Sequence, residues 1–365
     1  MKLDITEQML FALLRSALHG THADATIFAG ITSEAWQECY RLSVRQGVMA
    51  LAWDGLITLP TELQPPKSLK INWWLAVERC EKRYRYYCRV ISDLSTFYAT
   101  HGITAVQLKG VGFANNYPIP SHREGGDIDI FTYSADSSGL SDREANSLAD
   151  KLMRGRGIEV DFSHSQKHSM FYYKGIPIEN HKKFLNTEIY RTAVSMDILL
   201  RKLLRPRLTV LDGKYEVLTP SPDFNTVFLA FHSAQHYALG FAMHHLCDWA
   251  CLLKKQGLKI PEGVTDERFL NMIYALTHLC NRYLGTEVLV MKGGEELAEN
   301  LLKEMLHINV PATGKWGILV YKLKRMLHIH RLCDSVMRVS LVKWLWISVI
   351  QHVRFPQSIF RRTVS

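Results

Sequence analysis

The sequence predicts an α+β protein in which a small mixed β-sheet core is flanked by N-terminal helices and a C-terminal helical domain. Three observations predict this fold class. Apolar residues recur with helical spacing over residues 1–100, short β-type runs alternate with turn residues over 101–187, and helical spacing returns over 188–365. A chain of 365 residues with 47% hydrophobic content can bury a sizeable core. We expect these three ranges to be the domains.

The N-terminal region is expected to be helical, with one loop around Pro60, Pro65 and Pro66. Its longest helical pattern covers residues 71–98. The first 18 residues mix charged with apolar side chains, which favours an amphipathic helix over a signal peptide. The seven cysteines show no paired metal-ligand spacing, so we expect a protein of the reducing cytoplasm.

The central region begins with an expected buried strand over 103–108 that ends in Lys109-Gly110. The further elements expected, in order, are a helix over 111–117, a Pro/Ser turn over 118–121, a strand over 127–133, a helix over 141–154, and strands over 158–162 and 170–180. This order of short strands and helices predicts a compact α+β core.

The C-terminal region is mainly helical, with one strand-like interruption over 208–217 around an Asp212-Gly213 turn. Residues 315–365 contain ten Lys and Arg but one acid, so this segment accounts for the whole net charge of +9. An anionic partner is therefore expected at this end. We expect the apolar residues of 339–347 to pack onto the helical domain, the alternative being a lipid headgroup layer. No apolar run reaches the roughly 18 residues of a membrane span.

Candidate chemistry starts at Asp127 and Asp129, in the run Gly125-Gly126-Asp127-Ile128-Asp129. Strand alternation places both carboxylates on one face and the isoleucines on the other. Two adjacent carboxylates raise each other's pKa unless a cation lies between them, and Mg²⁺ prefers a few carboxylates together with phosphate oxygens. The alternative is a solvated strand edge.

Phosphate contacts are expected at Lys109, beside the expected start of a helix, and at Arg123. Each also has an ordinary structural interpretation, as a strand terminus and as a surface salt bridge. The third carboxylate is Glu179, which shares a strand face with His181. If that strand pairs beside 127–133, Glu179 joins the two aspartates and the three suit a two-metal centre. Glu179 could also accept the proton of an attacking hydroxyl.

The ordered set of motifs resembles a family of bacterial nucleotidyltransferases within the DNA polymerase β-like superfamily. The segments that carry the resemblance are Gly102-Ile103, Leu108-Lys109-Gly110, Tyr117-Pro118, Arg123, Gly126-Asp127-Ile128-Asp129, His168 and Glu179-Asn180-His181, with Gln46-Gly47-Val48, Phe231-His232 and Cys247-Asp248-Trp249 outside the core. Two departures stand out. The wider superfamily has Gly-Ser where this chain has Lys109-Gly110, and Asn180 occupies a position that is often apolar.

The resemblance implies that Asp127, Asp129 and Glu179 are catalytic and bind Mg²⁺ or Mn²⁺. It also implies nucleotide contacts, at Lys109, Gly110, Arg123 and Gly126. The expected reaction moves a nucleoside monophosphate from a nucleoside triphosphate such as ATP to a hydroxyl, with release of pyrophosphate. The acceptor could be a small molecule, a sugar, RNA or a protein. The alternatives are a catalytically silent, antitoxin-like binding protein on the same fold, and a protein that binds polyanions or membrane surfaces through its basic tail.

Histidines form a second group of interest. His232 and His236 lie four residues apart on an expected helix, with His244 and His245 nearby, a spacing that can serve zinc. The zinc-protease signature requires Glu after the first His, and Ser233 stands there. We therefore interpret these histidines as core or pocket-lining side chains.

Overall fold

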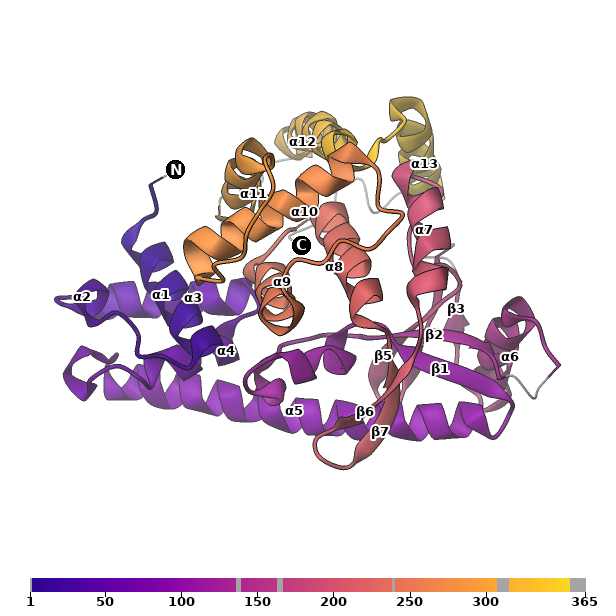
Figure 1. Cartoon of the computed structure of the whole chain (residues 1–365), viewed down its shortest axis with the longest axis horizontal. Coiled ribbons are helices and arrows are strands. Elements are labelled where there is room, and N and C mark those ends of the chain that lie inside the picture. Colours follow the sequence, from indigo (N-terminus) through magenta and orange to yellow (C-terminus); the bar gives the residue numbers. More distant parts are fainter. Residues whose placement is uncertain (1, 136–138, 163–166, 238–239, 307–314, 355–365) are drawn as a thin grey trace.

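The structure is a computed structural model, which describes residues 2–135, 139–162, 167–237, 240–306 and 315–354. Within helices α12 and α13 it does not describe the side chains of 315–325, 347–348 and 351–354. Helices and a single mixed sheet make up the described chain (Figure 1). The α+β class predicted from the sequence is confirmed.

The N-terminal region is helical, as expected. Its helices are α1 (Ile5–His19), α2 (Ala25–Phe28), α3 (Ser33–Arg45), α4 (Met49–Leu56) and the long α5 (Lys67–Ala99). Asp4 caps α1 and forms a reciprocal pair with Glu7, which satisfies backbone N–H groups that the first turn leaves free. In Figure 1, α5 runs along the bottom, under the other N-terminal helices at one end and under the sheet at the other.

The sheet has seven strands in the order β3-β4-β5-β2-β1-β7-β6. The strands are β1 (Ile103–Gln107), β2 (Ile128–Ser134), β3 (Val160–Asp161), β4 (His168–Tyr173), β5 (Ile176–His181), β6 (Arg207–Leu211) and β7 (Tyr215–Thr219). At its centre, β2 pairs antiparallel with β1 and parallel with β5. The helix α6 (Asp142–Gly155) follows β2.

The helix expected over 111–117 is replaced by two short 3₁₀ helices, Gly110–Gly112 and Ala114–Asn116. Gly110 has a positive φ of 66°, and Tyr117, which precedes a proline, is extended. Both features interrupt α-helical geometry. The segment after Lys109 is therefore a tight irregular turn, and it does not present the helix N-terminus that the sequence suggested.

The sheet extends beyond residue 187, because the hairpin β6–β7 adds to its β1 edge. Asp212 and Gly213 both have positive φ in the connecting turn, as the sequence suggested. The remaining helices are α7 (Thr192–Leu203), α8 (Pro222–His236), α9 (Met243–Gln256), α10 (Glu267–Leu279) with a π-helical end (Cys280–Leu284), α11 (Glu295–Leu306), α12 (Lys315–Met337) and α13 (Leu341–Arg354).

The two faces of the sheet pack into different cores. Ile128 and Ile130 point into a core shared with α5 and α6. Phe131, on the other face, stacks near Phe184, which in turn contacts Phe224 of α8. The second core is continuous with the N-terminal helices α1 to α4. Asp129 therefore lies on the face of β2 that is turned toward the helical domain.

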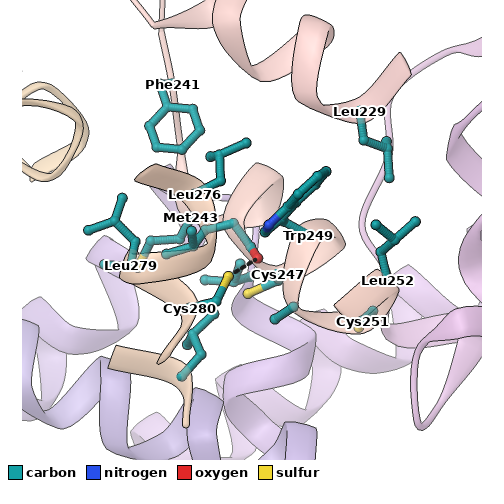
Figure 2. Close-up of a cluster of buried hydrophobic side chains, with 14 of the residues drawn as sticks. Leu229, Phe241, Met243, Cys247, Trp249, Cys251, Leu252, Leu276, Leu279 and Cys280 are labelled. Atoms are coloured by element: carbon teal, nitrogen blue, oxygen red, sulfur yellow. Dashed lines mark hydrogen bonds between the residues drawn. The ribbon is translucent and has the colours of Figure 1, made fainter. Parts of the chain in front are cut away.

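The interior of the helical domain is rich in sulfur and aromatic groups (Figure 2). Trp249 of α9 is fully buried and donates its indole N–H to Thr277 of α10 at 3.0 Å. The thiol of Cys280 contacts the carbonyl of Leu246 at 3.5 Å. All seven cysteines are buried and free, which matches the unpaired spacing in the sequence. These contacts fix the N-terminal half of α9, which also carries Asp248, the partner of Arg123.

The two C-terminal helices, α12 and α13, differ in how far they are buried. The end of α12 packs on α8 and α10, with Cys333, Val336 and Met337 buried. By contrast α13 exposes Val342 and Trp346, while Trp344 is packed against the core. Of the ten basic side chains of this segment, the structure describes Arg331, Arg338 and Lys343. The other seven lie outside the described side chains. Among the described helices, none combines the length and apolar character that a membrane span requires.

Candidate active site

The three predicted carboxylates come together on neighbouring strands. The parallel pairing of β2 and β5 sets Asp129 opposite Glu179, and Asp127 immediately precedes β2. One oxygen from each of Asp127, Asp129 and Glu179 lies within 4.8 Å of the others. The strand pairing that the sequence argument required is thus present. Asp127 and Glu179 are partly exposed, whereas Asp129 is fully buried.

Asp129 is the central group. Its Oδ1 accepts a hydrogen bond from His181 Nε2 at 3.0 Å. Its Oδ2 lies 3.3 Å from Lys109 Nζ as an ion pair, yet has no hydrogen-bond partner among the described residues. His181 Nε2 also lies 3.4 Å from Glu179, so one imidazole bridges two of the three carboxylates. A buried carboxylate oxygen without a hydrogen bond is costly in a protein alone.

The carboxylates differ in their proton affinity. The negative charge of Asp129, followed by burial, raises the pKa of Asp127. Burial acts to raise the pKa of Asp129 as well, but the charge of Lys109 and the hydrogen bond from His181 outweigh it and hold this pKa well below its usual range. At Glu179 burial is likewise outweighed, mainly by His181, and the pKa is lowered. Asp129 and Glu179 are therefore ionised at neutral pH.

The predicted nucleotide contacts on the β1 side lie at the edge of this cluster. Lys109 is largely buried, and its pKa is raised, because the nearby carboxylates outweigh the effect of burial. A side chain at Gly110 would be strained by the positive φ, and its Cβ would lie 3.4 Å from the carbonyl oxygen of Asp127. Gly126 has open space around it, and its carbonyl accepts a hydrogen bond from Tyr87 at 3.1 Å. Glycine at 110 thus permits close approach of two loops.

Arg123 is engaged in a buried ion pair. Its Nε and Nη2 donate to the two oxygens of Asp248 on α9 at 2.9 and 2.7 Å, and Tyr117 donates to the same carboxylate at 2.6 Å. Both charged side chains are almost fully buried, at 8% and 6% exposure. The pair fastens the loop before Asp127 to the helical domain. Arg123 could reach a phosphate only by giving up these bonds.

Sequence reasoning missed Lys167, which is adjacent to His168. Burial and the charge of Lys109 lower the pKa of Lys167, and the site carboxylates partly offset this. The ring of His168 lies 3.3 Å from Glu179, and burial lowers the pKa of His168 to about 4. The sequence carried no signal for Lys167, because its place follows from the pairing of His168 with His181 across β4 and β5. Lys167 contributes a second positive charge near the carboxylates.

The unusual Asn180 has a structural explanation. Its side chain points to the opposite side from Glu179, where it accepts hydrogen bonds from Thr132 at 2.8 Å and Asn146 at 3.0 Å. It also donates to Asp150 of α6 at 2.9 Å. This buried network fixes the packing of α6 against the sheet, with Oδ2 of Asp150 left without a hydrogen bond from the described residues.

The residues present fit a divalent cation. Three carboxylate oxygens converge, and one buried oxygen of Asp129 lacks a hydrogen bond, as expected of a metal ligand. An adjacent group of His168, Glu179 and His181 also has ligand atoms within 4.8 Å of one another. The carboxylate set suits Mg²⁺ or Mn²⁺, which favour oxygen ligands.

A mixed sheet with Asp129 on a central strand, Asp127 just before that strand and Glu179 on its parallel neighbour is a nucleotidyltransferase type of core. A family model described as "Uncharacterised nucleotidyltransferase" matches residues 32–285, and the chain belongs to that family. The match spans the N-terminal helices from α3 onward, the sheet and the helices up to the end of α10. No curated protein matches the chain.

Among solved structures, the chain is similar to an antigenic nucleotidyltransferase-like protein from Paracoccidioides brasiliensis. The two share 13% sequence identity, over 60% of this chain and 93% of that one, with a TM-score of 0.35. A similarity of this extent transfers neither a substrate nor an activity.

Proposed function

We propose that the protein is a metal-dependent nucleotidyltransferase, which moves a nucleoside monophosphate from a nucleoside triphosphate to a hydroxyl acceptor and releases pyrophosphate. The observation that carries the proposal is the convergence of Asp127, Asp129 and Glu179. At its centre lies the buried Oδ2 of Asp129, which faces Lys109 but accepts no hydrogen bond from the described residues. A cluster of like charges is unfavourable in a metal-free fold, so its presence favours a catalytic use over a silent one.

Asp127, Asp129 and Glu179 would hold the cation. When bound, Mg²⁺ or Mn²⁺ would neutralise charge on the triphosphate and make the acceptor hydroxyl more acidic. His181 keeps Asp129 and Glu179 in position through contacts at 3.0 and 3.4 Å. Glu179, ionised beside His168, is our candidate for accepting the hydroxyl proton.

Lys109, Gly110 and Gly126 are proposed to approach the triphosphate. Lys109 would donate to phosphate oxygens, and the missing side chain at Gly110 lets the backbone come close to the ligand. Arg123 remains a proposed phosphate contact, with the condition that nucleotide binding must compete with Asp248 for its guanidinium. The buried free thiols support our proposal of a reducing cytoplasm.

The test is transfer of label from each α-labelled nucleoside triphosphate, with Mg²⁺ or Mn²⁺ and a cell extract as source of acceptor. We expect labelled product and pyrophosphate from the wild type and none from Asp129→Asn. Fractionation of the extract into small molecules, RNA and protein then assigns the class of acceptor. Nucleotide binding with no product in any fraction would instead support the silent binding protein.

A further inference from the structure

The strongest cluster outside the carboxylate site consists of three histidines. His232 and His236 lie one turn apart at the end of α8, and His245 lies in the first turn of α9. One ring nitrogen from each lies within 4.8 Å of the others. The ring centroids of His236 lie 4.5 Å from those of His232 and 4.8 Å from those of His245. The sequence placed both His244 and His245 near the helical pair, and the fold selects His245 as the third imidazole.

We propose that His232, His236 and His245 form a binding site for a transition-metal ion of the zinc class, separate from the three carboxylates. In a tetrahedral zinc site with Zn–N bonds of about 2.05 Å, nitrogen ligands lie roughly 3.3 Å apart. The three nitrogens here are within 4.8 Å, so side-chain rotations that move each by about 1 Å reach that geometry. Three imidazoles leave the fourth position for water or an anionic ligand.

The ring nitrogens of His232 and His236 lack hydrogen-bond partners among the described residues. A neutral imidazole carries one donor and one acceptor nitrogen. Among the described residues, neither His232 nor His236 has a hydrogen-bond or ion-pair partner, and their recorded contacts are with other rings. Packing alone therefore gives these ring nitrogens no partner in the described part of the protein, whereas a metal ion would take one lone pair from each ring.

His245 has a backbone partner for its Nδ1 in either tautomer. Nδ1 accepts a hydrogen bond from the N–H of Ala242 at 3.2 Å in one tautomer and donates to the carbonyl oxygen of Ala242 at 3.3 Å in the other. The tautomer that donates from Nδ1 to this carbonyl leaves Nε2 with a free lone pair. A backbone carbonyl that receives the second ring N–H is a common outer partner of a metal ligand.

The electrostatics of the surroundings agree with neutral, ligand-ready imidazoles. Burial, together with the charge of Lys109, lowers the pKa of all three histidines, that of His236 to about 4. The charges of Lys109 and Lys167 lower the pKa of His236, whereas the charge of Asp129 acts to raise it. A cation at this position would therefore be repelled by the two lysines and attracted by Asp129. Because Lys109 is itself paired with Asp129, its repulsion is reduced.

Zinc and cobalt binding to the full-length chain test the site. Protein stripped with a chelator is loaded with one equivalent of Zn²⁺, and the zinc retained after gel filtration is measured. The proteins compared are the wild type, the ligand variants His232→Gln and His236→Gln, and the controls His244→Gln and Asp127→Asn. His244 is the matched control, since it is next to His245 but contributes no nitrogen to the group. We expect about one zinc in the wild type and both controls, and at least tenfold weaker binding in the two ligand variants.

Cobalt gives an independent readout. Co²⁺ in a tetrahedral imidazole site absorbs strongly in the visible range, whereas an octahedral oxygen site absorbs weakly. The spectrum should appear in the wild type and in Asp127→Asn and be absent from His236→Gln. If a ligand variant fails to fold by circular dichroism, the spectra of the wild type and Asp127→Asn decide alone.

Three results would overturn the proposal: no zinc in the wild type, equal zinc in the wild type and His236→Gln, or loss of zinc in Asp127→Asn. The last would assign the metal to the carboxylates. Each is independent of nucleotide transfer, so failure of this inference leaves the proposed function untouched.

Discussion

Replacing Arg123 by Met should strongly destabilise the fold. The change leaves the carboxylate of Asp248, which is 6% exposed, with the hydroxyl of Tyr117 as its remaining hydrogen-bond donor among those recorded. Removing one partner of a buried, hydrogen-bonded ion pair costs about 3–5 kcal/mol, because an uncompensated charge stays in the interior. We expect a loss of this size in the free energy of unfolding.

The assay is urea unfolding, followed by fluorescence and by circular dichroism. Arg41→Met is the control, because Arg41 and Glu38 are 60% and 42% exposed and their ion pair is 3.4 Å long. Such a surface pair is worth about 0–1 kcal/mol. The double variant Arg123→Met/Asp248→Leu should recover most of the loss, since no buried charge remains, less about 1–3 kcal/mol for the Tyr117 hydroxyl that loses its acceptor.

A loss of stability in Arg123→Met no larger than that in Arg41→Met would refute the assignment of a stabilising buried ion pair. If nucleotide affinity fell while stability was unchanged, Arg123 would act as the phosphate contact that the sequence suggested, and the pair with Asp248 would be incidental.

Three further predictions concern single side chains. Asp127→Asn should abolish transfer, yet without metal it should melt at the same or a higher temperature than the wild type, because the change removes the repulsion from Asp129. On addition of Mg²⁺ and nucleotide, the melting temperature should rise in the wild type alone. Equal rises in both proteins would contradict the metal assignment. Lys109→Ala should weaken nucleotide binding about ten- to hundredfold in a titration while lowering kcat less, since a charge-assisted hydrogen bond contributes about 1.5–3 kcal/mol; unchanged affinity would place Lys109 outside the nucleotide site. His122 is hydrogen-bonded to Asp54 at 2.8 Å and to Glu81 at 3.1 Å, and these partners outweigh burial and raise its pKa. The contribution of His122 to stability is full below the unfolded pKa of about 6.5 and is lost as the pH rises through the higher folded pKa. The difference in free energy of unfolding between the wild type and His122→Gln should therefore shrink from pH 6 to pH 9. A constant difference would refute the charged pair.

Much of the predicted secondary structure came from local sequence patterns. The alternation at Asp127, Ile128, Asp129 and Ile130 fixed which side chains share a face of β2, because the side-chain period of a strand is two. The helical spacing in α5 and the Asp212-Gly213 turn were likewise readable, since both depend on neighbours within a few residues. The carboxylate set could therefore be named from the chain alone.

The irregular segment after Lys109 was harder to predict. The sequence suggested a helix over 111–117, but the chain forms 3₁₀ turns. The outcome depends on Gly110, whose positive φ of 66° turns the chain beside the carbonyl of Asp127, in the segment that precedes β2. A residue pattern does not contain that contact.

Pairing at a distance was decided by tertiary structure. The sequence marked Asp127, Asp129 and Glu179 as candidates, and it could state only the condition under which they meet. The parallel register of β2 and β5 meets that condition. Arg123 pairs with Asp248, and Asn180 bonds to Thr132 and Asp150, all of them distant in the chain. Because these polar groups are buried, each needs such a partner. Sequence determines which side chains share an element, because the geometry of helices and strands is local. Only the packed fold determines which elements meet, because that choice depends on burying apolar faces and satisfying buried polar groups across the whole chain.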